Sequence, residues 1–195
     1  MDTLEAIRTR RSTRVFEQKA VEQDKLDQVL EAGRYAPSGG NNQTTHLIVI
    51  RSHKVLQDLA VLVKQKFSGM EVEPGMYKSL AAAIRNSKGE RYVFHYQAPV
   101  LILTANRIDY GNNIADCACV LENMMVAANA LDLGSCWINQ LKWLNENPVI
   151  TEYLRGIGLA EEERVYGALA LGYAKEGLPN RKALPRTGNP VTYVD

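Results

Sequence analysis

The sequence predicts an α+β domain, or an α/β domain with a small mixed sheet. Apolar residues recur at helical spacing in several segments, which indicates amphipathic helices. Short apolar runs rich in β-branched residues stand between these segments and are typical of strands. The chain has 195 residues, 46% hydrophobic and 23% charged, as is usual for one soluble globular domain. Because the helices outnumber the strands and alternate with them unevenly, both arrangements remain open.

The first half of the chain predicts three helices and one strand. Leu4 and Ile7 share one face of a short helix over residues 2–11, with Asp2 or Thr3 as its cap. Further elements are expected as a helix at 21–37 ended by Pro37, a strand at 46–51 and an amphipathic helix at 53–67. Residues 68–91 show no clear period and predict a mobile helical flap.

The second half is dominated by a long apolar helix. In order, we expect a strand at 98–106, a central buried helix at 112–134 with Gly134 as C-cap, one or two short helices at 141–159 broken at Pro148, and a strand at 164–174. The Gly- and Pro-rich tail ends in the strand-like VTYV (191–194), which is too apolar to stay in solvent. It should dock, for example on a second subunit.

Charge and cysteine content exclude several classes of protein. With 23 basic and 22 acidic residues the net charge is +1, which argues against a nucleic-acid binder. We expect no signal peptide and no membrane span, since the uncharged stretch 92–106 is too short. Cys117, Cys119 and Cys136 lack the spacing of a metal site and are expected to be buried, reduced thiols of a cytoplasmic protein.

Four polar segments are candidates for ligand binding. Arg10, Arg11, Ser12 and Arg14 suit a phosphate, because guanidinium groups offer paired N–H donors, or they form a solvated basic helix end. Arg181, Lys182 and Arg186 in the tail could close on the same phosphate, or form a solvated loop.

The other two segments could contact a planar ring. The loop APSGGNNQ (36–43) offers amide groups and a close backbone approach at its glycines, or it is a plain turn. LGSCWINQ (133–140) offers backbone N–H groups and Trp137, or it is a helix end followed by a core tryptophan.

The sequence shows no protein nucleophile or base. His53 is expected to be exposed, and His46 and His95 to be core residues with satisfied hydrogen bonds, so no Ser-His-Asp set is recognisable. Groups that bind anions and rings, without a catalytic side chain, favour an enzyme whose cofactor carries the chemistry.

Together these segments resemble the FMN-dependent nitroreductase family. RRSTRVF (10–16), APSGGNNQ (36–43), DLGSCWI (132–138) and LGYAKEGLPNRK (171–182) occur in the family's order and at suitable separations over nearly the whole chain. The resemblance implies a mixed, mostly antiparallel sheet flanked by helices. It also implies a homodimer with FMN at the interface, residues 1–180 as the FMN-binding domain and residues 181–195 as an arm on the partner subunit.

The resemblance further implies a set of cofactor-binding residues. Arg10, Ser12 and Arg14 would hold the phosphate and ribityl end, with Arg181 closing on it and Arg11 near the polar edge of the ring. The loop would come from the other subunit. The full set is Arg10, Arg11, Ser12, Arg14, Pro37, Ser38, Gly39, Asn41, Gln43, Ser135, Cys136, Trp137, Ile138, Arg181 and Lys182.

The implied reaction is ping-pong: NADH or NADPH gives a hydride to the flavin, and a small-molecule electron acceptor such as a nitro compound or quinone then takes the electrons. Alternatives are a flavin-storage protein without efficient turnover, and a specialised member that dehalogenates or fragments its flavin. The chain departs from the family's Q-P-W pattern with Gln43, Thr44, Thr45 and His46, which leaves the acceptor pocket undefined.

Overall fold

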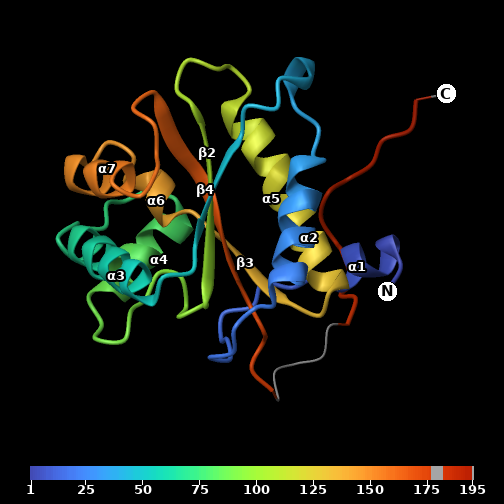
Figure 1. Ribbon diagram of the computed structural model, residues 1–195, viewed down its shortest axis with the longest axis horizontal. Helices are drawn as coiled ribbons and strands as arrows, with labels where there is room; N and C mark the ends of the chain where they lie inside the picture. Colours follow the sequence, from blue (N-terminus) through green and yellow to red (C-terminus); the bar gives the residue numbers. More distant parts are fainter. Residues whose placement is uncertain (177–181, 195) are drawn as a thin grey trace.

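The computed structural model describes residues 1–176 and 182–194, and within these a four-stranded sheet lies between two layers of helices (Figure 1). The strands are β1 (His46–Ile50), β2 (Val100–Arg107), β3 (Gly134–Ile138) and β4 (Glu163–Gly172), in the order β1-β2-β4-β3. Every neighbouring pair is antiparallel. The prediction of an α+β fold with a mostly antiparallel sheet is confirmed, and the α/β alternative is wrong.

Helices cover both faces of this sheet (Figure 1). One face packs against α2 (Gln23–Arg34) and α5 (Asn113–Ala130), with α1 (Thr3–Thr9) beside α5. The other face packs against α3 (His53–Ser68), α4 (Lys78–Ser87), α6 (Gln140–Trp143) and α7 (Pro148–Arg155). A short 3-10 turn, η1 (Gly39–Asn41), precedes β1.

Strand β2 explains why the sheet is covered on both sides. Val100 and Ile102 belong to the core under α2 and α5, whereas Leu101 and Leu103 belong to the core under α3, α4, α6 and α7. All four are at most 2% exposed. Since alternate side chains point to opposite faces of a strand, a run apolar at every position needs helices on both faces.

The end of α5 and strand β3 differ from the prediction. The helix stops at Ala130, and Asp132 adopts the left-handed conformation (φ 61°) while Leu133 N–H donates to the Ala128 carbonyl at 2.8 Å. Asp132 thus occupies the turn position that we assigned to a glycine. Gly134 is not a C-cap but the first residue of β3, which pairs with β4. The strand begins with Gly134 and Ser135, a pair typical of turns, so the local sequence pattern does not indicate a strand here.

The remaining expectations are largely met. Asp2 caps α1 and Pro148 begins α7, as the pattern predicts. Within the flap region α4 is a helix packed on α3, with Ile84 only 1% exposed. Residues 191–194 are exposed and form no strand in the single chain. No helix in the described ranges is long and apolar enough to cross a membrane.

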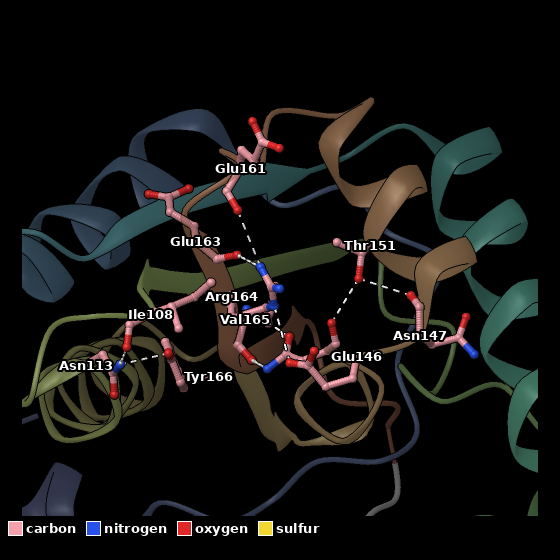
Figure 2. Close-up of polar contacts among 11 residues, drawn as sticks. Ile108, Asn113, Glu146, Asn147, Thr151, Glu161, Glu163, Arg164, Val165 and Tyr166 are labelled. Carbon is pink, nitrogen blue, oxygen red and sulfur yellow. Dashed lines mark hydrogen bonds and ion pairs between the residues drawn. The ribbon is translucent and has the colours of Figure 1, made fainter.

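A bulge in β4 is held by the loop before α7 (Figure 2). The register of β2 and β4 shifts so that Tyr166 is the extra residue. The Asn145 side chain accepts from Val165 N–H at 3.1 Å and donates to the Val165 carbonyl at 2.9 Å, in the manner of a neighbouring strand. Thr151 donates to the Asn145 carbonyl at 2.9 Å. The two Asn145 bonds satisfy the backbone N–H and carbonyl of Val165, at the part of the β4 edge that β3 does not reach.

The three cysteines do not share one environment. Cys117 and Cys136 are buried, as predicted, but Cys119 is exposed on α5, so the prediction is wrong for that residue. Burial raises the pKa of the Cys117 thiol from its ordinary value of 9.0 to about 11, partly opposed by the Thr45 hydroxyl. The thiol therefore stays neutral in the folded chain at pH values where it ionises in the unfolded chain.

We expect the free energy of unfolding to fall between pH 9 and pH 11 more steeply in the wild type than in Cys117→Ala. Above pH 9 the unfolded chain releases the Cys117 proton and the folded chain does not, which costs up to about 2–3 kcal/mol of stability by pH 11. Urea unfolding at pH 8, 9, 10 and 11 measures the two slopes, with Cys119→Ala as a control for the loss of one thiol. Equal slopes in the wild type and Cys117→Ala would contradict the raised pKa of the Cys117 thiol.

Candidate functional site

The arginine segment runs along the outer edge of β3. Ser12 and Ser135 form a parallel bridge, and Thr13 N–H donates to the Ser135 carbonyl at 2.8 Å. A second bridge joins Phe16, which is buried, to Ala174 after β4. The backbone from Ser12 to Phe16 is thus fixed to the sheet, and this fixes where the arginine side chains start.

Gly134 allows this close approach. A Cβ atom at Gly134 would lie 2.7 Å from Thr13 Oγ1 and 2.9 Å from Thr13 Cβ, closer than side chains pack. Glycine is therefore needed here for space, not to end a helix.

Gly134→Ala should displace the segment from 10 to 14 and weaken binding of a phosphate-bearing ligand. Overpacking of this kind costs about 1–3 kcal/mol, which also lowers the melting temperature. Gly111→Ala is the matched control, because nothing lies within 4 Å of a Cβ at Gly111. Calorimetry and ligand titration of both variants measure the effect, and equal values for the two would show that the Thr13 contact relaxes freely.

The arginine side chains gather around Cys136. Burial raises the pKa of the Cys136 thiol, and the nearby Arg14, Ser12 and Arg10 oppose that shift. Arg14 is exposed, and its guanidinium carbon lies 5.9 Å from the centre of the Tyr96 ring. The buried Nε of Arg10 lies 3.5 Å from Glu122 Oε1 and makes no hydrogen bond of good geometry. The site thus has cationic donors with unused capacity.

Arg11 points to the protein backbone. Its guanidinium donates to the carbonyls of Arg8 at 3.1 Å and Arg10 at 2.6 Å, and also to the carbonyl of Lys182. The last contact brings the tail back to the arginine segment through the backbone of Lys182; that the Lys182 side chain closes on a phosphate stays a prediction. Arg181 lies outside the described residues.

Strand β3 presents mainly the backbone of its outer edge to a ligand, because most of its side chains are buried. Ser135, Cys136 and Ile138 are buried, whereas Trp137 is half-buried and donates from Nε1 to Asn139 Oδ1 at 2.9 Å. Trp137 also packs against the core under α2 and α5, in partial agreement with the alternative interpretation of a core tryptophan.

The loop 36–43 forms a separate cluster. Gly40, Asn41 and Gln43 adopt left-handed backbone angles of 60°, 56° and 53°. Ser38 Oγ accepts from Gln43 N–H at 3.0 Å, and Asn41 Oδ1 accepts from Gln43 Nε2 at 3.2 Å. Pro37, Gly40, Asn41 and Gln43 are exposed, so their polar groups are open to a ligand from outside this chain.

The loop and the arginine segment lie at opposite ends of α5 (Figure 1). Asp116, in the first turn of α5, accepts from Gly39 N–H, whereas Asn129, in its last turn, donates to the Ala6 carbonyl of α1 at 2.8 Å. Asp116 and Asn129 are thirteen positions apart, which corresponds to about 20 Å of helix. One chain therefore carries two half-sites that it does not bring together, which we call the arginine half-site (10–14 with β3) and the loop half-site (36–43).

The histidines lie outside both half-sites. His53 is exposed, and His46 pairs with Glu163 at 2.9 Å. His95 is buried, and within the described ranges neither of its ring nitrogens has a hydrogen-bond partner, so the prediction that its bonds are satisfied is wrong. Burial lowers the pKa of His95. It lines a cleft of about 890 Å³ beside α3 that contains none of the predicted site residues.

Sequence reasoning missed Tyr96 and Glu122, which contact the arginine segment, and the role of Thr13 within it. No local pattern marks them, since Tyr96 and Glu122 come from the segment before β2 and from α5 and meet the arginines only in the folded chain. Among the described residues no group of His, Cys, Asp and Glu could hold a metal ion.

Comparison with known proteins gives consistent results. The sequence profile of the nitroreductase family matches residues 7–173. A crystal structure of a nitroreductase with bound FMN from Bacteroides fragilis superposes with a TM-score of 0.89 at 34% identity, covering 100% of both chains. A nitrobenzene nitroreductase from Ectopseudomonas oleovorans is 26% identical over 90% of this chain and 88% of its own. An Archaeoglobus fulgidus protein provisionally named NADH dehydrogenase/NAD(P)H nitroreductase is 26% identical, covering 90% and 87%.

Proposed function

The chain belongs to the nitroreductase family, and from this premise we propose that it is an FMN-dependent NAD(P)H oxidoreductase that reduces nitro compounds, quinones or similar acceptors. The observation that carries the proposal is the arginine half-site, where Arg10, Ser12 and Arg14 gather beside β3. The similar Bacteroides fragilis protein holds FMN, and the named relatives are nitroreductases.

The residues present fit FMN. A phosphate needs several charge-assisted donors. Arg14 is exposed beside the Tyr96 ring and forms no ion pair in the described ranges, whereas Arg10 lies 3.5 Å from Glu122 through its Nε. Ser12, also exposed, adds a hydroxyl. The loop half-site supplies amide groups, which can form hydrogen bonds with the polar edge of a flavin ring.

FMN, when bound, supplies a ring that accepts a hydride from NADH or NADPH and passes electrons to a second acceptor. The chain's own groups would bind and orient the flavin: Arg10, Ser12 and Arg14 would hold the phosphate end, and Arg11, whose guanidinium donates to backbone carbonyls in the single chain, would place positive charge near the ring's polar edge. Neither half-site contains a side chain suited to act as nucleophile, so we expect ping-pong kinetics in which donor and acceptor use one site in turn.

An absorption spectrum of the purified protein tests the proposal. We expect flavin bands that bleach on anaerobic addition of NADH or NADPH and return when a nitro compound or quinone is added. Bands that persist with both nucleotides would contradict the oxidoreductase and favour flavin storage. A colourless protein that does not take up added FMN would contradict flavin binding altogether.

We further propose that the protein acts as a homodimer in which each site joins the arginine half-site of one subunit to the loop half-site of the other. The separation of the half-sites along α5 supports this, because the arginine segment is attached at β3, after the end of the helix, and the loop at its first turn. Exposed apolar side chains support it as well: Leu4 and Ile7 of α1 are 61% and 49% exposed, and Tyr35 after α2 is 80% exposed.

The tail is the second support for a dimer. Val191 is 74% exposed and Tyr193 84%. The outer edge of β1 pairs with no strand in the described parts of the chain. The apolar, strand-like tail of one copy could pair with the open β1 edge of another copy by strand addition.

Removal of residues 183–195 should therefore loosen the dimer. We expect the truncated protein to shift towards monomer on dilution and to lose FMN in parallel, because its composite sites come apart. Light scattering over a range of concentrations measures the mass. A truncated protein that stays dimeric throughout would show that the arm does not hold the subunits together.

A further inference from the structure

Asp116 is a buried carboxylate attached to the loop half-site. It is 4% exposed, and its Oδ1 and Oδ2 accept from Gly39 N–H at 3.1 and 3.3 Å. No lysine or arginine in the described ranges forms an ion pair with it. Its charge is instead stabilised by its place in the first turn of α5, where helix N–H groups favour an anion, and by hydrogen bonds.

Tyr110 completes this contact. Its hydroxyl lies 2.9 Å from Asp116 Oδ2 and 3.1 Å from the Gly39 carbonyl, and it accepts from Asn42 Nδ2 at 3.4 Å. Gly39 N–H is thus held by the carboxylate, while the phenol, which has a single proton to donate, lies within hydrogen-bond distance of both the carboxylate and the Gly39 carbonyl. A side chain at position 39 would not fit, since a Cβ at Gly39 would lie 2.7 Å from the Tyr110 oxygen.

The residues after Gly39 are those that need such an anchor. Gly40, Asn41 and Gln43 have positive φ angles, which non-glycine residues adopt at a cost in energy. Apart from the bonds of Tyr110 and Asp116, the loop is held mainly by its own Ser38–Gln43 and Asn41–Gln43 contacts. A free loop of this composition would populate several conformations, so α5 selects one of them.

Building on the proposed function, we propose that Asp116 and Tyr110 are positioning residues that fix the loop half-site against the ring end of the flavin held by the partner subunit. The two residues touch neither FMN nor substrate; they act through Gly39. The proposal separates two kinds of binding residue: the arginine half-site recognises the phosphate, and the α5-anchored loop recognises the ring.

FMN and riboflavin distinguish these two roles, because both contain the ring and only FMN contains the phosphate. For Asp116→Ala we expect affinity to fall about tenfold for FMN and by the same factor for riboflavin. Arg14→Ala should weaken FMN alone. Asp116→Asn should recover most of the affinity, because its amide oxygen can still accept from Gly39 N–H, and Tyr110→Phe should give a smaller loss for both ligands.

Titration of each apoprotein by flavin fluorescence quenching measures these affinities, with the melting temperature recorded alongside. Asp24→Ala, an exposed first-turn aspartate on α2, is the matched control. A purely structural role for Asp116 would lower the melting temperature and leave both affinities unchanged below it, which would overturn the proposal. So would a loss confined to FMN. Failure of the proposed function looks different: the wild-type protein would then bind neither flavin.

Discussion

Arg14→Ala should lose FMN on dialysis, whereas the wild-type protein should keep it. The Arg14 guanidinium is exposed beside the Tyr96 ring, and no acidic group in the described ranges pairs with it, so its hydrogen-bonding capacity is available to a phosphate. A charge-assisted contact of this kind contributes about 1.5–3 kcal/mol, or roughly 10- to 100-fold in affinity.

The measurement is the ratio of flavin to protein absorbance before and after dialysis, followed by titration of the apoprotein. Arg155→Ala is the matched control, because Arg155 is exposed at the end of α7, far along the chain from both half-sites. High salt should weaken wild-type binding more than that of Arg14→Ala, since salt screens charged contacts. If Arg14→Ala retained stoichiometric FMN, the role assigned to Arg14 would be wrong.

Co-expression of Arg14→Ala with Gly39→Ala should restore FMN sites that neither variant has alone. Gly39→Ala spoils the loop half-site, because its Cβ would collide with Asn112 Nδ2 and the Tyr110 oxygen. In a mixed dimer, one site combines the intact arginine half-site of one subunit with the intact loop half-site of the other. The second site carries both defects.

Purification through two different tags isolates the mixed dimers. About half of their sites should bind FMN with wild-type affinity, as two-fold symmetry requires. Both single-variant dimers should bind weakly at every site. Mixed dimers in which no site regains affinity would place both half-sites in one subunit. If the loop did not contact FMN, the Gly39→Ala dimer alone would already bind FMN with wild-type affinity.

Much of the fold follows from local patterns along the chain. Helices α2, α3 and α5 are predicted by apolar residues at helical spacing, strands β1 and β2 by short apolar runs, and strand β4 by an apolar run of small residues. These elements bury their apolar side chains on the sheet, so sequence and structure carry the same signal. Strand β3 was missed because its Gly134 and Ser135 suit a turn equally well; it is a strand because β4 offers it a partner.

Some features of the candidate site could likewise be predicted from local sequence, and others could not. The arginines, the loop glycines and Trp137 could be found by residue type, since phosphate and ring recognition demand particular donors. The role of Gly134 could not, because it depends on Thr13, which lies more than a hundred residues earlier. The position of Asp116 under the loop could not be found either, as an aspartate in the first turn of a helix ordinarily serves only that helix.

The sequence by itself determined the type of most elements, the donor chemistry and the family resemblance, since each depends on residues close together in the chain. Only the tertiary structure decided which distant residues meet: Thr13 with Gly134, Gly39 with Asp116, and Arg10 with Glu122. It also placed the two half-sites at opposite ends of α5. The physical reason is that such contacts arise where helices and strands pack, and packing depends on the whole set of buried surfaces.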